Sequence, residues 1–408
     1  MNNLYFFILG KNPTLSTAEI RSLIDTNFIT HEAKIVGLSD DYLFLETKGK
    51  LDPLALQERL GGTIKIGTII DQTNKFNSET AVKILENYRR PHFGFSFYAS
   101  GNQKENYFSQ TEKWGMEIKN KLKEKNISSR WVTSREKFLS SVIVIKNKLL
   151  KEGAEFVFLM GKEKSYFGQT LSCQQFEEYG RRDFGRPSRI IEEGMLPPKI
   201  AKIMINLAQL PSRGTILDPF CGSGTILQEA IVMNYKKIIG TDLSEEAIKS
   251  SQENIKWLAT NYQLPVTSYQ LFQHDVRNLS KEIQPTSVDA IITEPYLGPI
   301  KVPDSKFIIH NSIPELSTLY LKAFSEFKKI LKPAGRVVII FPVFRTNYQL
   351  TFLPILDELK KSGWQTIDPI PQNLKNNNIL NITTRNSIIY SRPNQQVLRE
   401  IFIFSRIQ

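Results

Sequence analysis

The chain has 408 residues, more than one ordinary domain holds, so we expect two or three domains. Apolar residues make up 41% of it, enough for packed cores, and no apolar run is long enough to cross a bilayer. The net charge of +12 favours a polyanionic partner, although basic proteins are common and charge alone supports nucleic acid only weakly.

Residues 1–65 are interpreted as a small α+β unit. The opening sequence has no basic start and no cleavage site, so 4–9 reads as a first strand and not as a signal peptide. Further strands are expected at 33–38 and 42–46, and helices at 13–24 and 54–60, the second stopped by Gly61-Gly62.

Residues 66–170 are more basic and are predicted to be a binding module, because they contain no paired acids and no His–Cys arrangement. The expected elements are a half-buried strand at 93–98, a helix around Trp114, a second helix over 139–149 and a strand at 155–159. Cationic side chains proposed to contact a polyanionic partner are Lys119, Lys123 and Arg130. The plain alternative is that these lysines only cover solvated helix faces.

Residues 171–192 are interpreted as a linker, since 179–189 is dense in arginine and poor in aliphatic residues. Guanidinium groups suit phosphate oxygens, so this stretch adds Arg181, Arg186 and Arg189 as candidate contacts for nucleic acid. A helix over 200–207 follows, with Pro198 near its first turn, where proline is tolerated.

The stretch 215–229, TILDPFCGSGTILQE, combines an apolar strand, a glycine turn and a helix, the front of a nucleotide-binding βαβ unit. Gly222 and Gly224 permit positive φ and close approach of a ligand. The spacing is not G-x-G-x-x-G and no P-loop lysine follows, which argues against a pyrophosphate cradle. Asp218 would repel a phosphate but could accept a bond from an ammonium group. A nucleoside ligand with an amino-acid part fits better, and S-adenosylmethionine is the common one.

Two more acids end the next expected strands. Asp242 follows 237–241, about 20 residues after the glycine loop, where dinucleotide folds place the acid that holds ribose hydroxyls. Asp275 follows the expected strand 269–272, where its carboxylate could accept a hydrogen bond from an adenine amino group. Ser244 is the predicted N-cap of the helix after Asp242. Three acids at successive strand ends are more specific than one, because a single acid is more often a cap or a solvated turn residue.

A fourth strand, 288–293, ends in Thr293-Glu294-Pro295-Tyr296. A helix over 316–331, a strand at 335–341 and terminal strands at 387–390 and 401–404 follow, so the second half of the chain is predicted to be an open α/β sheet. The two cysteines and the histidine spacing suggest no bound metal and fit a reducing, cytoplasmic setting.

The loop DPFCGSGT at 218–225 resembles the cofactor loop of amino-directed S-adenosylmethionine-dependent methyltransferases. TEPY at 293–296 resembles their [DNS]-P-P-[YFW] motif but departs from it. The nearer resemblance is to THUMP-domain tRNA guanine-N2 methyltransferases that act at guanosine 10. Four more segments support this resemblance: YFFILG at 5–10, GRPSR at 185–189, GMLPPK at 194–199 and YSRP at 390–393.

This resemblance implies a Rossmann-like class I methyltransferase domain at 193–408, with a seven-stranded sheet whose last strand is antiparallel. It implies a ferredoxin-like unit at 1–65 and a THUMP RNA-binding domain at 66–170, which together grip tRNA. The working expectation for oligomeric state is a monomer. The implied cofactor is S-adenosylmethionine, and the residues expected to bind it are Pro197, Asp218, Phe220, Gly222, Gly224, Thr225, Asp242, Leu243, Asp275 and Val276.

An exocyclic amine is a weak nucleophile, so its site must accept its N–H bonds, hold it beside the methyl donor and stack the base. The expected catalytic residues are Thr293, Glu294, Pro295 and Tyr296, in one of two alignments. Either Thr293 replaces the usual acid of the motif, or Glu294 does. We favour Glu294, because a carboxylate accepts amine protons better than a hydroxyl.

Three functions are therefore compared. The leading one is methyl transfer to the N2 amine of a tRNA guanosine. A DNA adenine-N6 or cytosine-N4 methyltransferase is the second, but the basic region precedes the fold and no target-recognition segment follows it. The third is an RNA-binding protein with an inactive methyltransferase fold, which the altered TEPY motif would allow and the intact loop and acids oppose.

Overall fold

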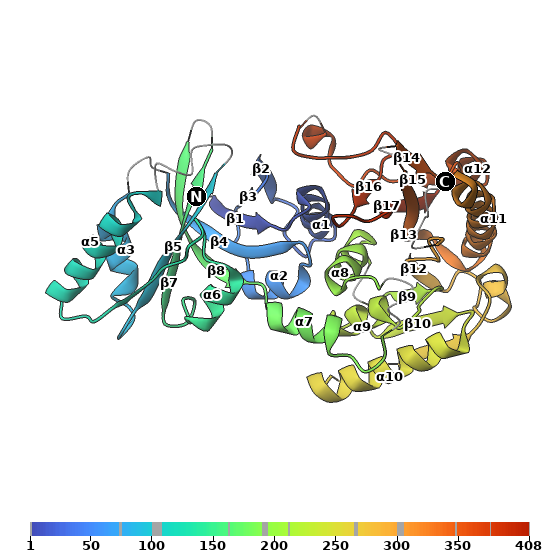
Figure 1. Ribbon diagram of the computed structural model, residues 1–408, viewed down its shortest axis with the longest axis horizontal. Helices are drawn as coiled ribbons and strands as arrows, with labels where there is room; N and C mark the ends of the chain where they lie inside the picture. Colours follow the sequence, from blue (N-terminus) through green and yellow to red (C-terminus); the bar gives the residue numbers. More distant parts are fainter. Residues whose placement is uncertain are drawn as a thin grey trace. The chain divides into compact units, whose positions relative to one another are not determined.

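The computed structural model describes residues 2–72, 76–99, 108–161, 164–189, 195–210, 213–264, 268–299, 306–346, 349–375 and 377–407. The chain divides into two compact units (Figure 1), of which the first is Met1–Ser16 with Asn27–Glu178 and the second is Thr17–Thr26 with Tyr179–Gln408. Among the described residues, we find no helix with the length and apolarity needed to span a membrane.

The first unit contains one eight-stranded sheet in the order β2-β3-β1-β4-β8-β7-β5-β6. Its strands are β1 Asn3–Leu9, β2 Lys34–Leu38, β3 Tyr42–Thr47, β4 Thr63–Gln72, β5 His92–Ala99, β6 Arg130–Val132, β7 Gly153–Met160 and β8 Ser165–Cys173. The accompanying helices are α2 Pro53–Arg59, α3 Ser78–Leu85, α5 Thr111–Glu124 and α6 Ser141–Lys146, while α1 Pro13–Asp25 and α7 Phe176–Phe184 each straddle a limit between the two units.

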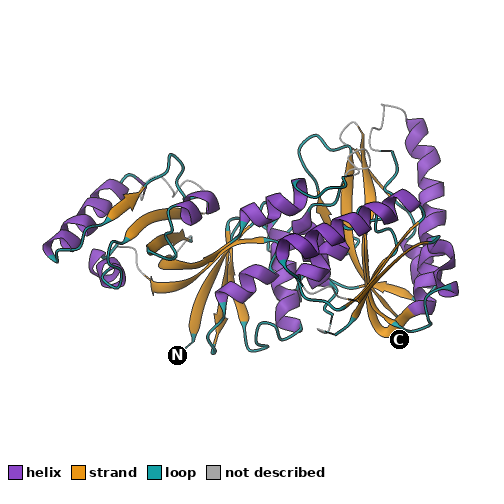
Figure 2. Cartoon of the chain, turned by 90° about the horizontal axis from the view of Figure 1, so that it is seen from below, coloured by secondary structure: helices purple, strands orange, loops and turns teal. Residues whose placement is uncertain are grey.

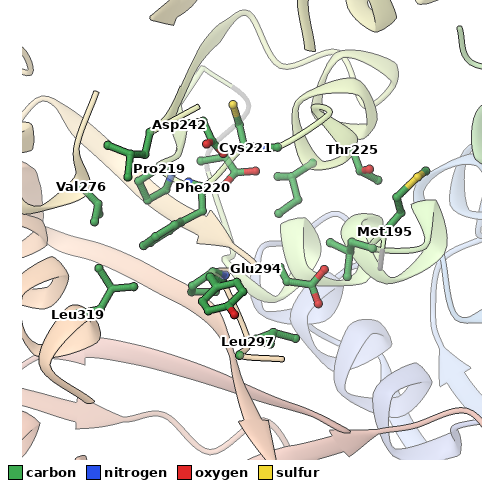
Figure 3. Close-up of a pocket in the computed structure, with 18 of the residues that line it drawn as sticks. Met195, Pro219, Phe220, Cys221, Thr225, Asp242, Val276, Glu294, Leu297 and Leu319 are labelled. Carbon is green, nitrogen blue, oxygen red and sulfur yellow. Dashed lines mark hydrogen bonds between the residues drawn. The ribbon is translucent and has the colours of Figure 1, made fainter. Parts of the chain in front are cut away.

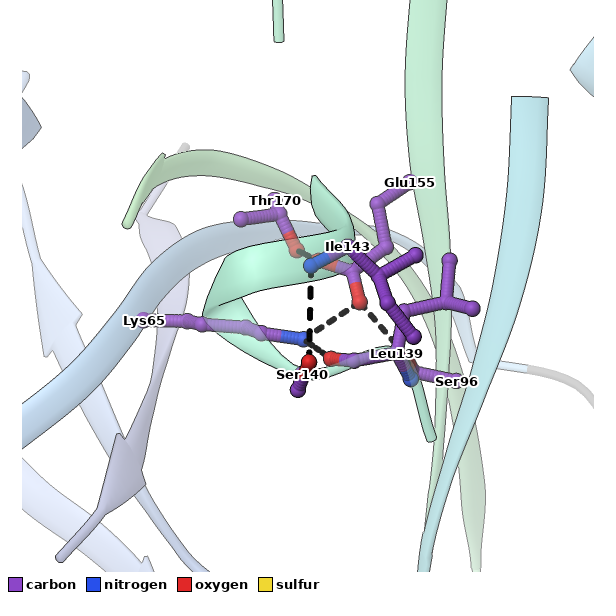
Figure 4. A network of polar contacts seen from close by, with 7 residues as sticks. All are labelled: Lys65, Ser96, Leu139, Ser140, Ile143, Glu155 and Thr170. Atoms are coloured by element: carbon purple, nitrogen blue, oxygen red, sulfur yellow. Dashed lines mark hydrogen bonds and ion pairs between the residues drawn. The ribbon is translucent and has the colours of Figure 1, made fainter. Parts of the chain in front are cut away.

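A buried polar network connects four neighbouring strands of this sheet (Figure 4). The carboxylate of Glu155 on β7 pairs with Lys65 on β4 and accepts bonds from Ser96 on β5 at 2.5 Å and Thr170 on β8 at 2.7 Å. Burial acts to lower the pKa of Lys65, but Glu155 overrides it and the pKa lies above its ordinary value. Lys65 therefore keeps its charge inside the sheet, where its bonds to Glu155 and to the carbonyl of Leu139 compensate the loss of water.

Two sequence interpretations of this region need correction. The segment expected as a half-buried strand, now β5, is buried on both faces because it lies between β7 and β6 and aromatic side chains pack over it. Strands β4 and β8 were not expected at all, and β4 runs across the proposed domain limit at residue 65. The limits at 65 and 170, and the ferredoxin-like and THUMP assignments, stay predictions.

The second unit contains a nine-stranded sheet with a continuous path β11-β10-β9-β12-β13-β17-β15. Its strands are β9 Thr215–Asp218, β10 Lys237–Asp242, β11 Ser268–Gln273, β12 Val288–Thr293, β13 Leu331–Thr346, β14 Gln349–Phe352, β15 Trp364–Thr366, β16 Ile388–Tyr390 and β17 Val397–Arg406. Strands β9 to β13 are parallel along this path, whereas β17 is antiparallel to β13, as predicted for the last strand. The predicted count of seven is wrong, because β14 pairs with β13 and β16 with β17 beside the seven strands of the path.

Helices cover both faces of this sheet (Figure 2). These helices form two groups. In the first group two helices contact α9, and in the second group two helices contact α11. The elements are α8 Pro198–Leu207, α9 Thr225–Val232 and α10 Glu245–Tyr262 in the first group, η2 Val276–Lys281, α11 Lys306–Ile330 and α12 Leu356–Lys361 in the second, and a short turn η3 Gln372–Leu374. A core of buried aromatic and aliphatic residues fills the α11 side, with Phe324, Phe341, Trp364 and Phe404 in mutual contact. This packing fixes the strands relative to one another and so determines where their terminal side chains lie.

Candidate functional site

A cavity of about 990 Å³ lies in the second unit, at the carboxyl ends of the parallel strands (Figure 3). Four acids from four neighbouring strands reach it: Asp275 after β11, Asp242 at the end of β10, Asp218 at the end of β9 and Glu294 after β12. In open α/β sheets this edge is where ligands bind. The sheet order thus brings together acids that are spread over 77 sequence positions, from 218 to 294.

The glycine loop between β9 and α9 has the backbone that the sequence predicts. Gly222 and Gly224 have φ of +50° and +81°, and the amide of Gly222 donates to Asp242 Oδ2 at 2.9 Å. A β-carbon on Gly222 would meet nothing within 4 Å, whereas one on Gly224 would lie 2.8 Å from Ser251 Oγ. The loop therefore leaves room for a ligand against Gly222 and packs tightly against α10 at Gly224.

Asp218 is almost completely buried at the end of β9. Its Oδ1 accepts bonds from Thr293 Oγ1 at 2.7 Å and from the backbone amide of Phe220 at 3.2 Å. Burial raises the pKa of this carboxyl to about 7, more than the two hydrogen bonds lower it. The site can therefore supply a negative charge here near neutral pH, and a cationic ligand group would favour that charge.

Two of the remaining three acids, Asp242 and Asp275, are held by local backbone bonds. Asp242 Oδ1 accepts from the amide of Ser244 at 2.9 Å, so both of its oxygens point along the loop edge of the cavity. Asp275 caps η2 through the amide of Arg277 at 2.9 Å. The Arg277 guanidinium beside it lowers the pKa of Asp275. Ser244 is confirmed as the N-cap of α10, since its hydroxyl accepts from the amide of Ala247 at 3.3 Å.

The four residues predicted to act on the target amine separate into two groups. Thr293 is fully buried, donates to Asp218 and is not part of the cavity lining. Glu294, Pro295 and Tyr296 do line the cavity, and the ring of Tyr296 is 58% exposed. The hydroxyl of Tyr320 donates to the carbonyl oxygen of Tyr296 at 2.8 Å and anchors this loop to α11.

Most residues predicted to bind the cofactor lie around the same cavity. Pro197 and Gly224 do not line it: Pro197 is the N-cap of α8, and the adjacent Met195 and Leu196 face the cavity instead. Cys221 also lines the cavity, but burial raises the pKa of its thiol well above the ordinary value. A protonated thiol is a poor nucleophile, so packing within the loop explains this residue.

Sequence reasoning missed Arg399, whose side chain is 6% exposed and reaches the cavity from β17. Its Nε donates to Glu294 Oε1 at 2.5 Å, across 105 positions of sequence. Arg277, Leu319 and the segment from Asn394 to Val397 also line the cavity without having been predicted. No local motif marks Arg399 or the segment from Asn394 to Val397, because only the pairing of β17 with β13 brings the end of the chain to this edge.

The stretch interpreted as a linker is partly helical and contains buried charges. Arg182 on α7 pairs with Glu229 on α9 at 2.6 Å, and neither side chain is more than 5% exposed. Arg186 is only 3% exposed and donates to Thr225 Oγ1 at 2.7 Å, so its predicted contact with RNA is not available in this structure. Sequence composition could not distinguish this inward arginine from Arg181 and Arg189, which are exposed.

The three cations predicted in the first unit, Lys119, Lys123 and Arg130, are exposed. The backbone amide of Arg130 donates to the carbonyl of Pro91 at 2.9 Å, just before β5. Near this point is a second cavity of about 490 Å³, which was not predicted and is lined by Asn87, Tyr88, Arg89, Arg90, Lys151 and Glu152. Positive charge therefore gathers where β5 and β7 begin, since these parallel strands start side by side.

Comparisons with known proteins bear on the second unit most directly. Residues 186–350 match the family model described as RMKL-like, methyltransferase domain, and residues 73–253 match one described as DNA methylase. The crystal structure of TrmN from Thermus thermophilus aligns over 100% of both chains with a TM-score of 0.54 at 15% identity, which shows a shared fold.

Curated relatives give the sequence relationship. The chain is 33% identical over 105 residues to the tRNA (guanine(10)-N2)-dimethyltransferase of Methanothermobacter thermautotrophicus, which is 26% of this chain and 28% of that protein. It is 28% identical over 139 residues to the enzyme of the same name from Methanocaldococcus jannaschii, covering 33% of this chain and 38% of that protein. The chain thus matches less than two-fifths of the length of either relative. In sequence it is related to the tRNA guanine-N2 methyltransferases, as its motifs predicted, and in fold to TrmN.

Proposed function

We propose that this chain transfers a methyl group from S-adenosylmethionine to the exocyclic N2 amine of a guanosine in tRNA, at position 10. The observation that carries the proposal is the convergence of Asp218, Asp242, Asp275 and Glu294 on one cavity. Three acids suit an ammonium, a ribose and an adenine, and the fourth stands beside them on the next strand. The names of the curated relatives support the choice of tRNA and of the guanine amine.

The residues present fit the cofactor. Gly222 leaves open space against its backbone, and Asp242 offers carboxylate oxygens to ribose hydroxyls. Asp275, whose carboxylate also accepts bonds from the Arg277 guanidinium, lines the cavity where an adenine amino group would lie. Asp218 would face the ammonium, whose charge would favour the ionised form of a carboxyl with a pKa of about 7. When bound, S-adenosylmethionine supplies an electrophilic methyl group on a sulfonium.

Glu294 then acts on the target amine. Its carboxylate accepts N–H bonds from the N2 nitrogen, which orients the nitrogen lone pair and stabilises the positive charge that develops as the new N–C bond forms. The proton released from N2 can pass to the same carboxylate. Tyr296, with an exposed ring at the cavity, would stack on the base. Of the two alignments of the motif, this arrangement supports the one in which Glu294 replaces the usual acid.

The basic surface of the first unit supports an RNA partner. Lys119, Lys123 and Arg130 are exposed, and the cavity beside Arg89 and Arg90 adds further cationic groups. Such groups bind phosphates by displacing counterions, so the affinity for tRNA should fall steeply with salt. The first unit would position the tRNA, and the chemistry would belong to the second.

One experiment tests the proposal directly. The purified chain is incubated with methyl-labelled S-adenosylmethionine and either bulk tRNA or DNA, and the products are digested to nucleosides. We expect label in N2-methylguanosine or N2,N2-dimethylguanosine from tRNA and none from DNA. Label in DNA adenine or cytosine would instead support the second function, to which the match with a DNA methylase model also points. No label in either substrate would support an inactive fold.

A further inference from the structure

The ion pair between Glu294 and Arg399 is the most unusual feature of the cavity wall. Arg399 Nε donates to Oε1 at 2.5 Å, and Nη2 reaches Oε2 at 3.5 Å. Both side chains line the cavity, yet they are only 13% and 6% exposed, respectively. The pair therefore lies almost out of water at the position where the target base would meet the site.

The geometry of the pair is asymmetric. Oε1 has a short bond to the guanidinium, whereas the contact of Oε2 is at the limit of a hydrogen bond. An ionised carboxylate has about four lone-pair sites, so Glu294 retains acceptor capacity for a ligand. Because Arg399 holds the carboxylate from β17, the direction of the remaining lone pairs is set by the sheet and not by a flexible side chain.

We propose that Arg399 is a positioning residue that keeps Glu294 ionised and aimed, so that the carboxylate accepts the two adjacent N–H groups of guanine, N1–H and N2–H, and thereby selects guanine. This inference rests on the proposed function and adds to it the means of base recognition. Glu294 accepts from the base, and Arg399 acts through Glu294.

The Watson–Crick edges of the bases explain the selectivity. Guanine presents two neighbouring donors, N1–H and N2–H, and an ionised carboxylate offers only acceptors. Adenine presents an acceptor at N1 beside its N6 donors, and cytosine an acceptor at N3 beside its N4 donors. Either base would bring a lone pair against Glu294 and leave a buried acceptor unpaired, which is the kind of mismatch that hydrogen-bonding sites reject most strongly.

The charges around Glu294 agree with this role. Burial raises the pKa of Glu294, and Arg399 is the group that lowers it most. Arg392 adds a smaller lowering effect, and Asp218 and Tyr320 also interact electrostatically with Glu294. Without the guanidinium, burial would favour the protonated acid, whose O–H is a donor and no longer matches guanine.

The chain also offers a matched control. The next residue of β17, Glu400, forms a buried pair with Arg385 at 3.3 Å, outside the lining of the cavity. Burial raises the pKa of Glu400 and Arg385 lowers it, as Arg399 does for Glu294. Arg385→Met therefore removes an ion pair to the neighbouring residue of β17 without changing the lining of the cavity.

The first test is the pH profile of kcat/KM for methyl transfer to a tRNA transcript. Arg399→Met should move the acidic limb to higher pH, because the carboxylate then forms only at higher pH, and activity at pH 7 should fall about tenfold or more. Arg399→Lys keeps the charge and should restore most of the profile, and Arg385→Met should leave it in place. An Arg399→Met profile that matches the parent would overturn the proposal. If Arg399→Met does not fold, the profile of Arg399→Lys and the next test decide.

The second test measures the selectivity for guanine over adenine. Glu294→Gln keeps the shape but offers one donor and one acceptor, which suits adenine or cytosine better than guanine. With transcripts that carry guanine or adenine at the target position, the ratio of guanine to adenine methylation should fall at least tenfold relative to the parent. An unchanged ratio would refute base recognition by Glu294. A parent enzyme that methylates no guanosine at all would refute the proposed function itself, which is a separate outcome.

Discussion

The buried carboxyl of Asp218 should make the stability of this protein depend on pH in the sense opposite to that of an ion-paired acid. Its pKa is raised from 3.8 to about 7. This rise in the pKa corresponds to roughly 4 kcal/mol of free energy. The folded chain holds this proton more tightly than the unfolded chain, so the contribution is full below pH 3.8 and is lost as the pH rises through about 7.

Asp218→Asn removes this dependence and keeps the shape of the side chain. The amide oxygen can still accept the bonds from Thr293 and Phe220, both of which go to Oδ1 in the parent. Near pH 4.5 most of the contribution remains, so we expect the variant to be only about 1 kcal/mol more stable than the parent. At pH 8 the variant should be more stable, by up to roughly 4 kcal/mol, because it has no charge to bury.

Urea unfolding of both proteins at pH 4.5 and pH 8, followed by tryptophan fluorescence, measures this effect. The quantity to compare is the difference in the free energy of unfolding between variant and parent, because the contributions of the other titrating groups cancel in it. Asp275→Asn is a control of opposite sign, because Arg277 lowers the pKa of Asp275 and its contribution is lost as the pH falls. If the Asp218→Asn difference is the same at both pH values, the carboxyl does not titrate as its burial requires.

The same variant separates stability from ligand binding. At pH 8, where Asp218→Asn should be the more stable protein, it should bind S-adenosylmethionine more weakly than the parent, because the cofactor's ammonium loses its charged partner. Calorimetry at pH 5.5 and pH 7, where the cofactor's amino group stays protonated, should show affinity that rises with pH in the parent and stays flat in the variant. A variant that binds as tightly as the parent would place the ammonium away from Asp218.

Three further predictions test the rest of the molecule. Asp242→Ala should lower the affinity for S-adenosylmethionine at least tenfold in calorimetry, since charge-assisted bonds to ribose hydroxyls contribute about 1.5–3 kcal/mol each; unchanged affinity would remove the ribose assignment. Glu155→Ala leaves Lys65 buried without its partner and should destabilise the first unit by about 3–5 kcal/mol in urea unfolding, whereas a loss below 1 kcal/mol would mean that water reaches the pair. Replacing Lys119 and Lys123 by alanine should weaken tRNA binding at low salt and reduce the slope of log K against log salt, and an unchanged slope would show that these lysines contact no phosphate.

The sequence by itself determined the local elements of the second half of the chain and the acids at their ends. Strands β9, β10, β11 and β12 lie within a residue or so of their predicted limits. Each is a short apolar run that ends at a polar residue and lies between helices, and such a run is typical of a buried strand. The glycine loop and the N-cap Ser244 were predictable for the same reason. Each depends on residues close together in the chain, whose local conformational preferences act before any tertiary contact forms.

Only the tertiary structure decided which side chains share the cavity and which charges lie inside. Glu294 meets Arg399 because β17 inserts between β13 and β15, an order that no local pattern specifies. Arg186 turns inward to Thr225 while Arg189, three positions later, is exposed, although both have the same composition around them. Burial is a property of the packed sheet and its helices, so the raised pKa of Asp218 and the pairing of Glu294 follow from the fold and could not be read from the motif.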